Sequence, residues 1–214
     1  MEVSIIELRK HAHFAPLIEK YGPPTLRRGK TPFQSLARAI IYQQISGKAA
    51  ASIYKKFVAL FGVEVDLPLD WESKKAQKFP TPQEVLAAPP QKLRSAGLSS
   101  QKVAYIRDLA QKIADGTVPH EKLHRLSNEE IVTTLTQVKG IGVWTVQMFL
   151  IFTLNRPDVL PTGDLAIQKA FQIVYKLRKL PSPKHMERLA KLWREHASVA
   201  SWYLWRVAES AKKQ

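Results

Sequence analysis

Two glycines, Gly140 and Gly142, flank a single isoleucine between two stretches of helical apolar period. The first stretch ends near residue 138 and the second covers residues 143–154, so the pattern predicts a helix, a tight turn and a second helix. Glycine adopts a positive φ without strain, and because it lacks a Cβ it lets another backbone approach closely. We therefore predict a hairpin of two helices, which is the most informative feature of the chain.

Helix-start signals recur along the rest of the sequence. Thr31 is followed by proline, and segments 81–84 and 127–130 each carry a Ser or Thr followed three residues later by Glu, which is the capping-box pattern. No segment shows the sustained polar–apolar alternation of a strand, and residues 63–82 indicate a surface excursion between helices. The sequence predicts an all-α protein of about ten helices, either one large domain or two small lobes.

The charge balance favours a polyanionic partner. The 214 residues include 33 Lys and Arg but 18 Asp and Glu, a formal net charge of +15. Lys and Arg at phosphates release condensed counterions, so nucleic acid explains this excess better than a basic surface without a partner. We expect no membrane association, because no apolar run reaches the ~18 residues of a membrane span. We expect an intracellular location, in the cytoplasm or nucleoid of a prokaryote or in a eukaryotic nucleus.

The residue types argue against a metal or redox centre. The chain has no cysteine, which excludes disulfides, thiolate zinc sites and iron–sulfur clusters. His120 and His124 are four residues apart, but no acidic third ligand is placed for zinc. Neither a Walker loop nor a dinucleotide fingerprint is present. We expect no metal site and no required cofactor.

The hairpin has two interpretations. The first amides of its second helix carry the positive end of the helix dipole, which suits a phosphate, and Lys139 adds charge beside them. A Gly-X-Gly sequence between helices is also found at sharp corners that bind nothing. Ile141 anchors the turn to its own core and favours the phosphate clamp. Such a clamp grips DNA without reading its sequence.

Asp164 stands 22 residues after Gly142, at the start of a predicted helix over residues 165–177. Asp is a favoured N-cap, and most Asp residues at helix starts have no other role. An acid beside a DNA clamp is also placed to stabilise the oxocarbenium-like state of a sugar that is losing its base. Both interpretations remain open on these residues.

Aromatic residues gather near the hairpin and in the last helix. Trp144 lies in the first turn of the second hairpin helix, and Trp202, Tyr203 and Trp205 crowd the last helix. Such residues usually fill a core, and we expect this of Trp202. One or two indole faces beside a carboxylate also suit a flipped base, especially a cationic one.

Four blocks of sequence resemble the helix–hairpin–helix DNA glycosylase superfamily, and more closely its alkylbase branch, the 3-methyladenine DNA glycosylase II family. The resemblance implies two helical lobes with a DNA- and base-binding cleft between them. The blocks are residues 33–46, 96–106, 138–149 with 160–164, and 198–206. The implied lobes are residues 32–156, which contain the hairpin, and residues 1–31 with 157–214.

The resemblance also implies the chemistry. Asp164 matches the catalytic aspartate of the family. Bifunctional members carry a lysine in the first turn of the second hairpin helix, where its amine forms a Schiff base with the sugar. That position is Trp144 here, so we expect no β-lyase activity. The absence of cysteine also argues against the cluster-bearing branches.

The remaining site residues follow from the same resemblance. Gln44 matches a wedge that fills the gap left by an everted nucleotide, and Ser46 is expected near the minor groove. Met148 stands where relatives often place an aromatic residue, and residues 195–197 depart from the family pattern. The expected base pocket consists of Trp144, Met148, Tyr203 and Trp205. The expected DNA contacts are Gln43, Gln44, Ser46, Lys139, Gly140, Ile141, Gly142 and Thr145.

The sequence thus predicts a monofunctional DNA glycosylase of base excision repair. We expect it to act as a monomer on duplex DNA, to hydrolyse the N-glycosidic bond of 3-methyladenine- or 7-methylguanine-type purines, and to leave an abasic site. The resemblance further implies a structural monovalent cation at the hairpin carbonyls. The alternatives are a glycosylase for deaminated or oxidised bases, and a non-catalytic DNA-binding or lesion-recognition protein.

Overall fold

The computed structural model describes residues 1–24, 31–64 and 78–212. Within these ranges the chain forms twelve α-helices and two 3₁₀ turns and no strand, which confirms the all-α prediction. In the same ranges no helix has both the length and the apolar character needed to cross a bilayer. Most of the predicted excursion over residues 63–82 lies outside the described residues.

Internal contacts divide the chain into two compact units, residues 1–28 with 150–214 (unit 1) and residues 29–149 (unit 2). The sequence predicts lobe boundaries after residues 31 and 156. In the structure the boundaries follow residues 28 and 149, which is three and seven residues earlier. The second difference has a local cause. The segment that follows residue 149 makes its contacts with unit 1, since Phe152 stacks on Trp205 and the Arg156 carbonyl accepts a hydrogen bond from Ser198.

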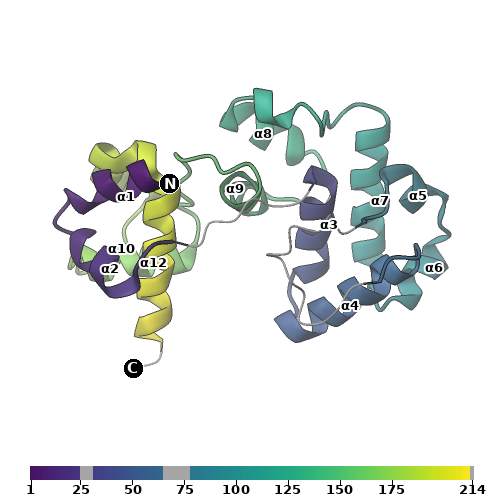
Figure 1. The fold of residues 1–214 in the computed structure, drawn as a ribbon, viewed down its shortest axis with the longest axis horizontal. Helices are drawn as coiled ribbons and strands as arrows, with labels where there is room; N and C mark the ends of the chain where they lie inside the picture. The colour runs from purple at the N-terminus through teal and green to yellow at the C-terminus, as the bar shows by residue number, and fades with distance from the viewer. Residues whose placement is uncertain (25–30, 65–77, 213–214) are drawn as a thin grey trace. The chain divides into compact units, whose positions relative to one another are not determined.

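Helices α3, α4, α5 and α7 build the core of unit 2, in which α3 packs on α4 and α7, and α5 packs on α7 (Figure 1). Phe79 joins the aromatic side chains of this core, with ring centroids 5.7 Å from Phe33 and 6.0 Å from Tyr54. The helices of unit 2 are α3 (Pro32–Tyr42), α4 (Gly47–Ala59), α5 (Pro82–Ala87), α6 (Pro90–Ser95), α7 (Ser100–Ala114), η1 (Leu123–Arg125), α8 (Asn128–Leu135) and the first part of α9 (Val143–Phe152).

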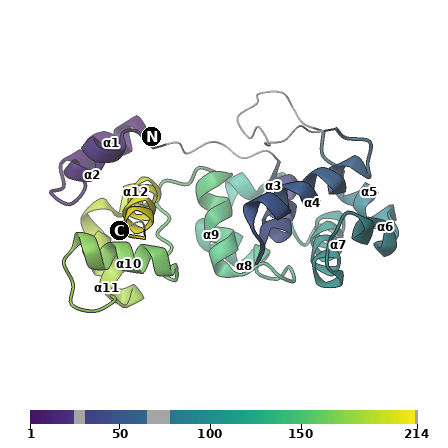
Figure 2. The same ribbon diagram turned by 90° about the horizontal axis from the view of Figure 1, so that it is seen from below.

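Helix α12 is the centre of unit 1 and packs on α1, α2 and α10 (Figure 2). Its residues from Ala197 to Leu204 are all buried, so this helix is surrounded by apolar side chains over two turns. The helices of unit 1 are α1 (Glu2–Arg9), α2 (Ala15–Tyr21), the end of α9, α10 (Leu165–Val174), α11 (Pro183–Ala190), η2 (Lys191–His196) and α12 (Ala197–Ala211).

Most predicted helix starts are confirmed by their caps. The hydroxyl of Thr31 accepts a hydrogen bond from the Gln34 amide, and segments 81–84 and 127–130 each form a complete capping box. Two helices end earlier than predicted. Helix α9 ends at Phe152 rather than at residue 154, and helix α10 ends at Val174 rather than at residue 177. Beyond the end of α10, Lys176 adopts a positive φ of 51°.

Candidate functional site

The hairpin lies between α8 and α9 in unit 2. The amide of Val138 donates to the Leu135 carbonyl, and the amide of Ile141 donates to the Val138 carbonyl, each at 3.1 Å. Ile141 is buried, whereas Lys139 between these bonds is exposed. The predicted anchoring role of Ile141 is therefore confirmed, and the turn presents a lysine to solvent.

The two glycines of the hairpin have different roles. Gly140 adopts a φ of +80°, and a Cβ at this position would lie 2.1 Å from Cδ2 of Tyr105. Gly142 does not lie in the left-handed region, and no heavy atom lies within 4 Å of a Cβ built on it. Gly140 is therefore required by the fold, whereas Gly142 leaves open space in front of the first turn of α9.

Helix α7 holds the hairpin from one side. Oδ2 of Asp108 accepts a hydrogen bond from the Lys139 amide at 2.8 Å and forms an ion pair with Lys112 at 2.8 Å. Burial raises the pKa of Asp108, but the bonds from Lys112 and from the Lys139 amide outweigh it and lower the pKa overall. Tyr105 lies three residues before Asp108 and thus on the same face of α7.

The first turn of α9 faces solvent. Val143 and Trp144 are 52% and 51% exposed, whereas the side chain of Thr145 is buried. The first amides of an α-helix have no acceptor within the helix and lie at the positive end of its dipole. Together with exposed Lys139, this turn is chemically suited to a phosphate group. Thr145 can contribute its backbone amide to such a site, not its buried side chain.

The loop from Gln43 to Ser46 follows α3 in the same unit. The side-chain amide of Gln43 donates to the Gly140 carbonyl at 2.8 Å, so this polar group is engaged by the hairpin. Gln44 is exposed and adopts a positive φ of 58°. Ser46 caps α4, since its hydroxyl accepts from the Ala49 amide at 3.3 Å. Of the two glutamines, Gln44 is the one that the loop presents to solvent.

Asp164 is the N-cap of α10 in unit 1. Its Oδ1 accepts hydrogen bonds from the Ala166 amide at 2.7 Å and from the Ile167 amide at 3.2 Å. Its Oδ2 accepts a hydrogen bond from the indole Nε1 of Trp205 at 3.3 Å. The capping interpretation is thus confirmed, and the same half-buried carboxylate also contacts an aromatic side chain.

Trp205 stacks on a residue that the sequence did not single out. Its ring lies 5.8 Å from that of Phe152, with an angle of 26° between the planes. Phe152 follows Met148 by four residues on α9, as Met148 follows Trp144, and this helical spacing is the signal that could have identified it. Met148 itself is half-buried.

The prediction that Tyr203 lines a base pocket is wrong. Its side chain is completely buried, and its hydroxyl donates to the Gly22 carbonyl at 2.9 Å. Tyr203 belongs to the core beside α2 and has no exposed ring face to offer a base. Trp202 is 8% exposed and belongs to the same core, which confirms its expected structural role.

Ser198 secures the segment that leads to Asp164. Its buried hydroxyl donates to the Arg156 carbonyl at 2.5 Å and accepts a hydrogen bond from the Val159 amide at 3.1 Å. The backbone amide of Ser198 donates to the Pro157 carbonyl at 2.8 Å. This local network is the structural reason for the serine at the start of the 198–206 block.

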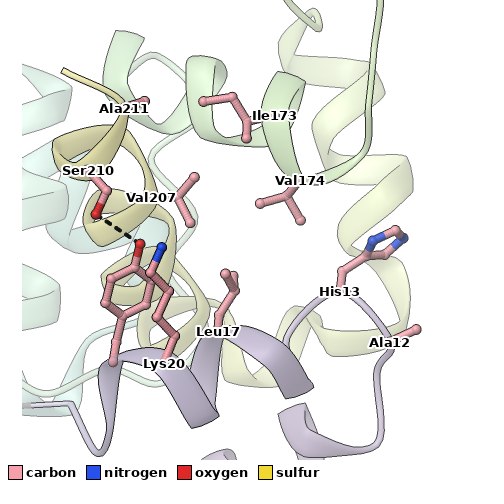
Figure 3. Close-up of a pocket in the computed structure, with 10 residues that line it drawn as sticks. Ala12, His13, Leu17, Lys20, Ile173, Val174, Val207, Ser210 and Ala211 are labelled. Carbon is pink, nitrogen blue, oxygen red and sulfur yellow. Dashed lines mark hydrogen bonds between the residues drawn. The ribbon is translucent and has the colours of Figure 1, made fainter. Parts of the chain in front are cut away.

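Unit 1 also contains a cavity of about 350 Å³ between α2, the end of α10 and α12 (Figure 3). Leu17, Val174 and Val207 form its apolar wall, and Tyr21 and Ser210 share a hydrogen bond of 3.0 Å at one side. None of the predicted site residues lines it. In the part of the chain that the structure describes, no three His, Cys, Asp or Glu side chains are grouped as metal ligands.

Comparisons with known proteins agree with this arrangement. Residues 37–195 match the HhH-GPD superfamily of base excision DNA repair proteins. DNA-3-methyladenine glycosylase 1 of Schizosaccharomyces pombe is 35% identical over 196 residues, which are 91% of this chain and 80% of the relative.

Two solved structures are similar over nearly the whole chain. The 3-methyladenine DNA glycosylase of Schizosaccharomyces pombe in complex with abasic DNA has a TM-score of 0.76 at 33% identity and covers 96% of both chains. A DNA-3-methyladenine glycosidase from Bacillus halodurans has a TM-score of 0.82 at 29% identity and covers 97% of this chain and 89% of its own.

Proposed function

The chain belongs to the HhH-GPD superfamily of base excision DNA repair proteins, and we propose that it is a monofunctional DNA glycosylase that releases alkylated purines from duplex DNA. Its relatives named above are DNA-3-methyladenine glycosylases, and one of them was solved with abasic DNA, the product of base release. The substrate proposed here is therefore a 3-methyladenine- or 7-methylguanine-type base.

The contact between Asp164 and Trp205 is the observation that carries this proposal. One carboxylate oxygen is held by two amides of α10 and the other by the Trp205 indole, so the negative charge has a fixed position. A fixed charge stabilises a developing cation better than a mobile one, because it needs no reorganisation during the reaction. The cation here is the oxocarbenium-like sugar.

Alkylated purines suit a site with one such carboxylate. An N3- or N7-alkylated purine is cationic, so the electrons of the breaking N-glycosidic bond neutralise it as it leaves, and no general acid is required. Water then bonds to the sugar carbon, guided by Asp164, and loses its proton to the carboxylate or to solvent. The products are a neutral alkylated base and an abasic site.

Aromatic side chains support recognition of a cationic base. The Trp205 ring stacks on Phe152 beside the carboxylate, and Trp144 is half-exposed. Indole faces attract cations through their quadrupole. Trp144 also supports the monofunctional assignment, because an indole cannot form the Schiff base that β-elimination requires.

DNA binding is assigned to unit 2. In this proposal the first amides of α9 and exposed Lys139 bind a phosphate, and exposed Gln44 enters the duplex. We also propose that backbone carbonyls of the hairpin bind a structural monovalent cation, because carbonyl oxygens are hard ligands. Such a cation would stabilise the turn electrostatically.

We further propose that the protein acts as a monomer.

The proposal is tested by base release from methylated duplex DNA. Wild type should release 3-methyladenine and 7-methylguanine, and Asp164→Asn should be slower by about 10²- to 10³-fold, the usual loss for one charge-stabilising group. Asparagine still caps α10, so DNA affinity should be retained. The matched control is Glu187→Gln, which removes an exposed acid of the same unit and should change neither quantity.

Three outcomes would contradict the proposal. Wild-type rates in Asp164→Asn would refute the catalytic assignment. Binding of methylated DNA without any base release would indicate a lesion-recognition protein. Release of hypoxanthine or oxidised purines in preference to methylated ones would indicate the other class of glycosylase.

A further inference from the structure

The loop after α3 and the hairpin before α9 are linked by a hydrogen bond across 97 residues of sequence. The side-chain amide of Gln43 donates to the carbonyl of Gly140 at 2.8 Å. The neighbour of Gln43 is the proposed wedge Gln44, and the neighbours of Gly140 are the residues proposed to grip a phosphate. The bond therefore joins two segments with different proposed tasks on DNA.

Both segments are also fastened to one face of α7. The ammonium of Lys102 donates to the carbonyls of Ile41 and Gln43 at 2.7 and 2.8 Å, which secures the end of α3. Tyr105 packs against Gly140, and Asp108 accepts the hydrogen bond from the hairpin amide. These three α7 residues are spaced three apart and thus share a face of the helix. Figure 1 shows α3 beside α7 in this unit.

The wedge residue has a strained backbone that needs such support. Gln44 is not a glycine, yet it adopts a positive φ of 58°. Residues other than glycine occupy this region at a cost and remain there when the surrounding structure holds them. On one side of Gln44, Lys102 holds the Gln43 carbonyl; on the other, Ser46 caps α4. The Gln43 side chain adds the connection to the hairpin.

We propose that Gln43 is a positioning residue, not a DNA contact: its amide ties the wedge loop to the hairpin, so that docking of the hairpin on the DNA backbone sets how Gln44 enters the duplex. This inference rests on the proposed function. It predicts that loss of the Gln43 donor weakens nucleotide eversion but not the general affinity for DNA.

The test uses the full chain and two duplexes. One is undamaged, and binding is followed by fluorescence anisotropy. The other carries a tetrahydrofuran abasic analogue beside 2-aminopurine, whose fluorescence reports unstacking without any chemistry. Gln43→Met keeps the length of the side chain but has no donor, and Gln43→Glu is isosteric but accepts when ionised. Gln44→Ala removes the wedge, and Gln83→Met is the matched control at an exposed position of α5.

We expect Gln43→Met and Gln43→Glu to bind the undamaged duplex within twofold of wild type. The equilibrium constant for unstacking should fall about fivefold, the factor expected for one net hydrogen bond. Gln44→Ala should lose most of the unstacking signal, and Gln83→Met should behave as wild type. A protonated glutamic acid can donate again, so the Gln43→Glu defect should shrink as the pH falls from 7 to 4.5, toward the pKa of about 4.3 of glutamate. The unstacking defect of Gln43→Met should not change over this pH range, because methionine has no titratable group.

Several results would overturn this role. An equal loss of affinity and unstacking in Gln43→Met would make Gln43 a DNA contact, and unchanged unstacking in both variants would mean that the bond couples nothing. Absence of a 2-aminopurine signal with wild type would also refute it. Because the abasic analogue needs no base release, a protein that unstacks DNA as predicted but releases no base would contradict only the proposed function.

Discussion

The indole Nε1 of Trp205 lies 3.3 Å from Oδ2 of Asp164 and donates a hydrogen bond to it. The two residues are 41 positions apart and meet because α12 packs on α10, whose N-cap is Asp164. The carboxylate thus has one oxygen committed to the fold and the other directed at an aromatic side chain. A single aspartate thus caps α10 through one oxygen and accepts the bond from the Trp205 indole through the other.

Replacement of Trp205 by phenylalanine tests this contact. Phenylalanine retains a ring to stack on Phe152 but has no donor for Asp164. Hydrogen bonds to charged groups contribute about 1.5–3 kcal/mol, and the length of this one places it at the weak end, so base release should slow about tenfold. Single-turnover release from methylated duplex DNA measures the change. Buried Trp202→Phe is the control, and a wild-type rate in Trp205→Phe would refute the role of the indole donor.

Borohydride trapping tests the monofunctional assignment. Because Trp144 has no amine, wild type incubated with methylated duplex and borohydride should give no covalent protein–DNA adduct, and the strand should remain intact at the abasic site until alkali is added. Denaturing electrophoresis detects both the adduct and strand cleavage. A trapped adduct would show that another amine of the chain attacks the sugar.

Local features of the fold could be predicted from the sequence, because capping bonds join residues three positions apart. The caps at Thr31, Thr81 and Ser127 follow from this, as does Asp164 as the cap of α10. At the start of α7 two adjacent serines, Ser99 and Ser100, could each serve as the cap by residue type, and the structure uses Ser99.

Contacts between distant segments could not be predicted in this way. The reason for Gly140 is Tyr105, 35 residues earlier, and the stacking of Phe152 on Trp205 depends on how two helices pack. The wrong prediction for Tyr203 has a similar cause. Every residue from Ala197 to Leu204 is buried, so this part of α12 has no polar face. Without a polar face, the periodicity of the sequence cannot distinguish a residue that lines a pocket from one in the core.

The two hairpin glycines give a matched pair of variants. Gly140→Ala places a Cβ 2.1 Å from the Tyr105 ring at a φ of +80°, so it should destabilise the protein by about 2–4 kcal/mol. Gly142→Ala meets no heavy atom within 4 Å and should change stability by less than about 0.5 kcal/mol. Its methyl group would stand before the first amides of α9 and should weaken DNA binding about tenfold.

Urea unfolding and anisotropy with undamaged duplex measure the two effects separately. Equal destabilisation by both substitutions would contradict the different roles of the glycines. Unchanged DNA affinity in Gly142→Ala would remove the first turn of α9 from the proposed DNA interface.

Asp108 should make the anchoring of the hairpin dependent on pH. Its hydrogen bonds from Lys112 and the Lys139 amide hold its pKa below the ordinary value in the folded protein, despite burial, which raises it. A carboxyl whose pKa is lower in the folded state than in the unfolded chain stabilises the fold fully above the unfolded value of about 3.9, and this stabilisation is lost as the pH falls through the folded value. Asp108→Asn should therefore be less stable than wild type by about 1 kcal/mol at pH 7, since the pair is partly buried. The difference in unfolding free energy between wild type and Asp108→Asn should stay constant down to about pH 5 and narrow between pH 5 and pH 3, as urea unfolding at each pH will measure.

Lys112→Met removes the ion-pair partner of Asp108 while the bond from the Lys139 amide remains. This variant should show a smaller loss of stability over the same pH range. A stability difference between Asp108→Asn and wild type that persists unchanged at pH 3 would show that the carboxylate charge does not anchor the hairpin.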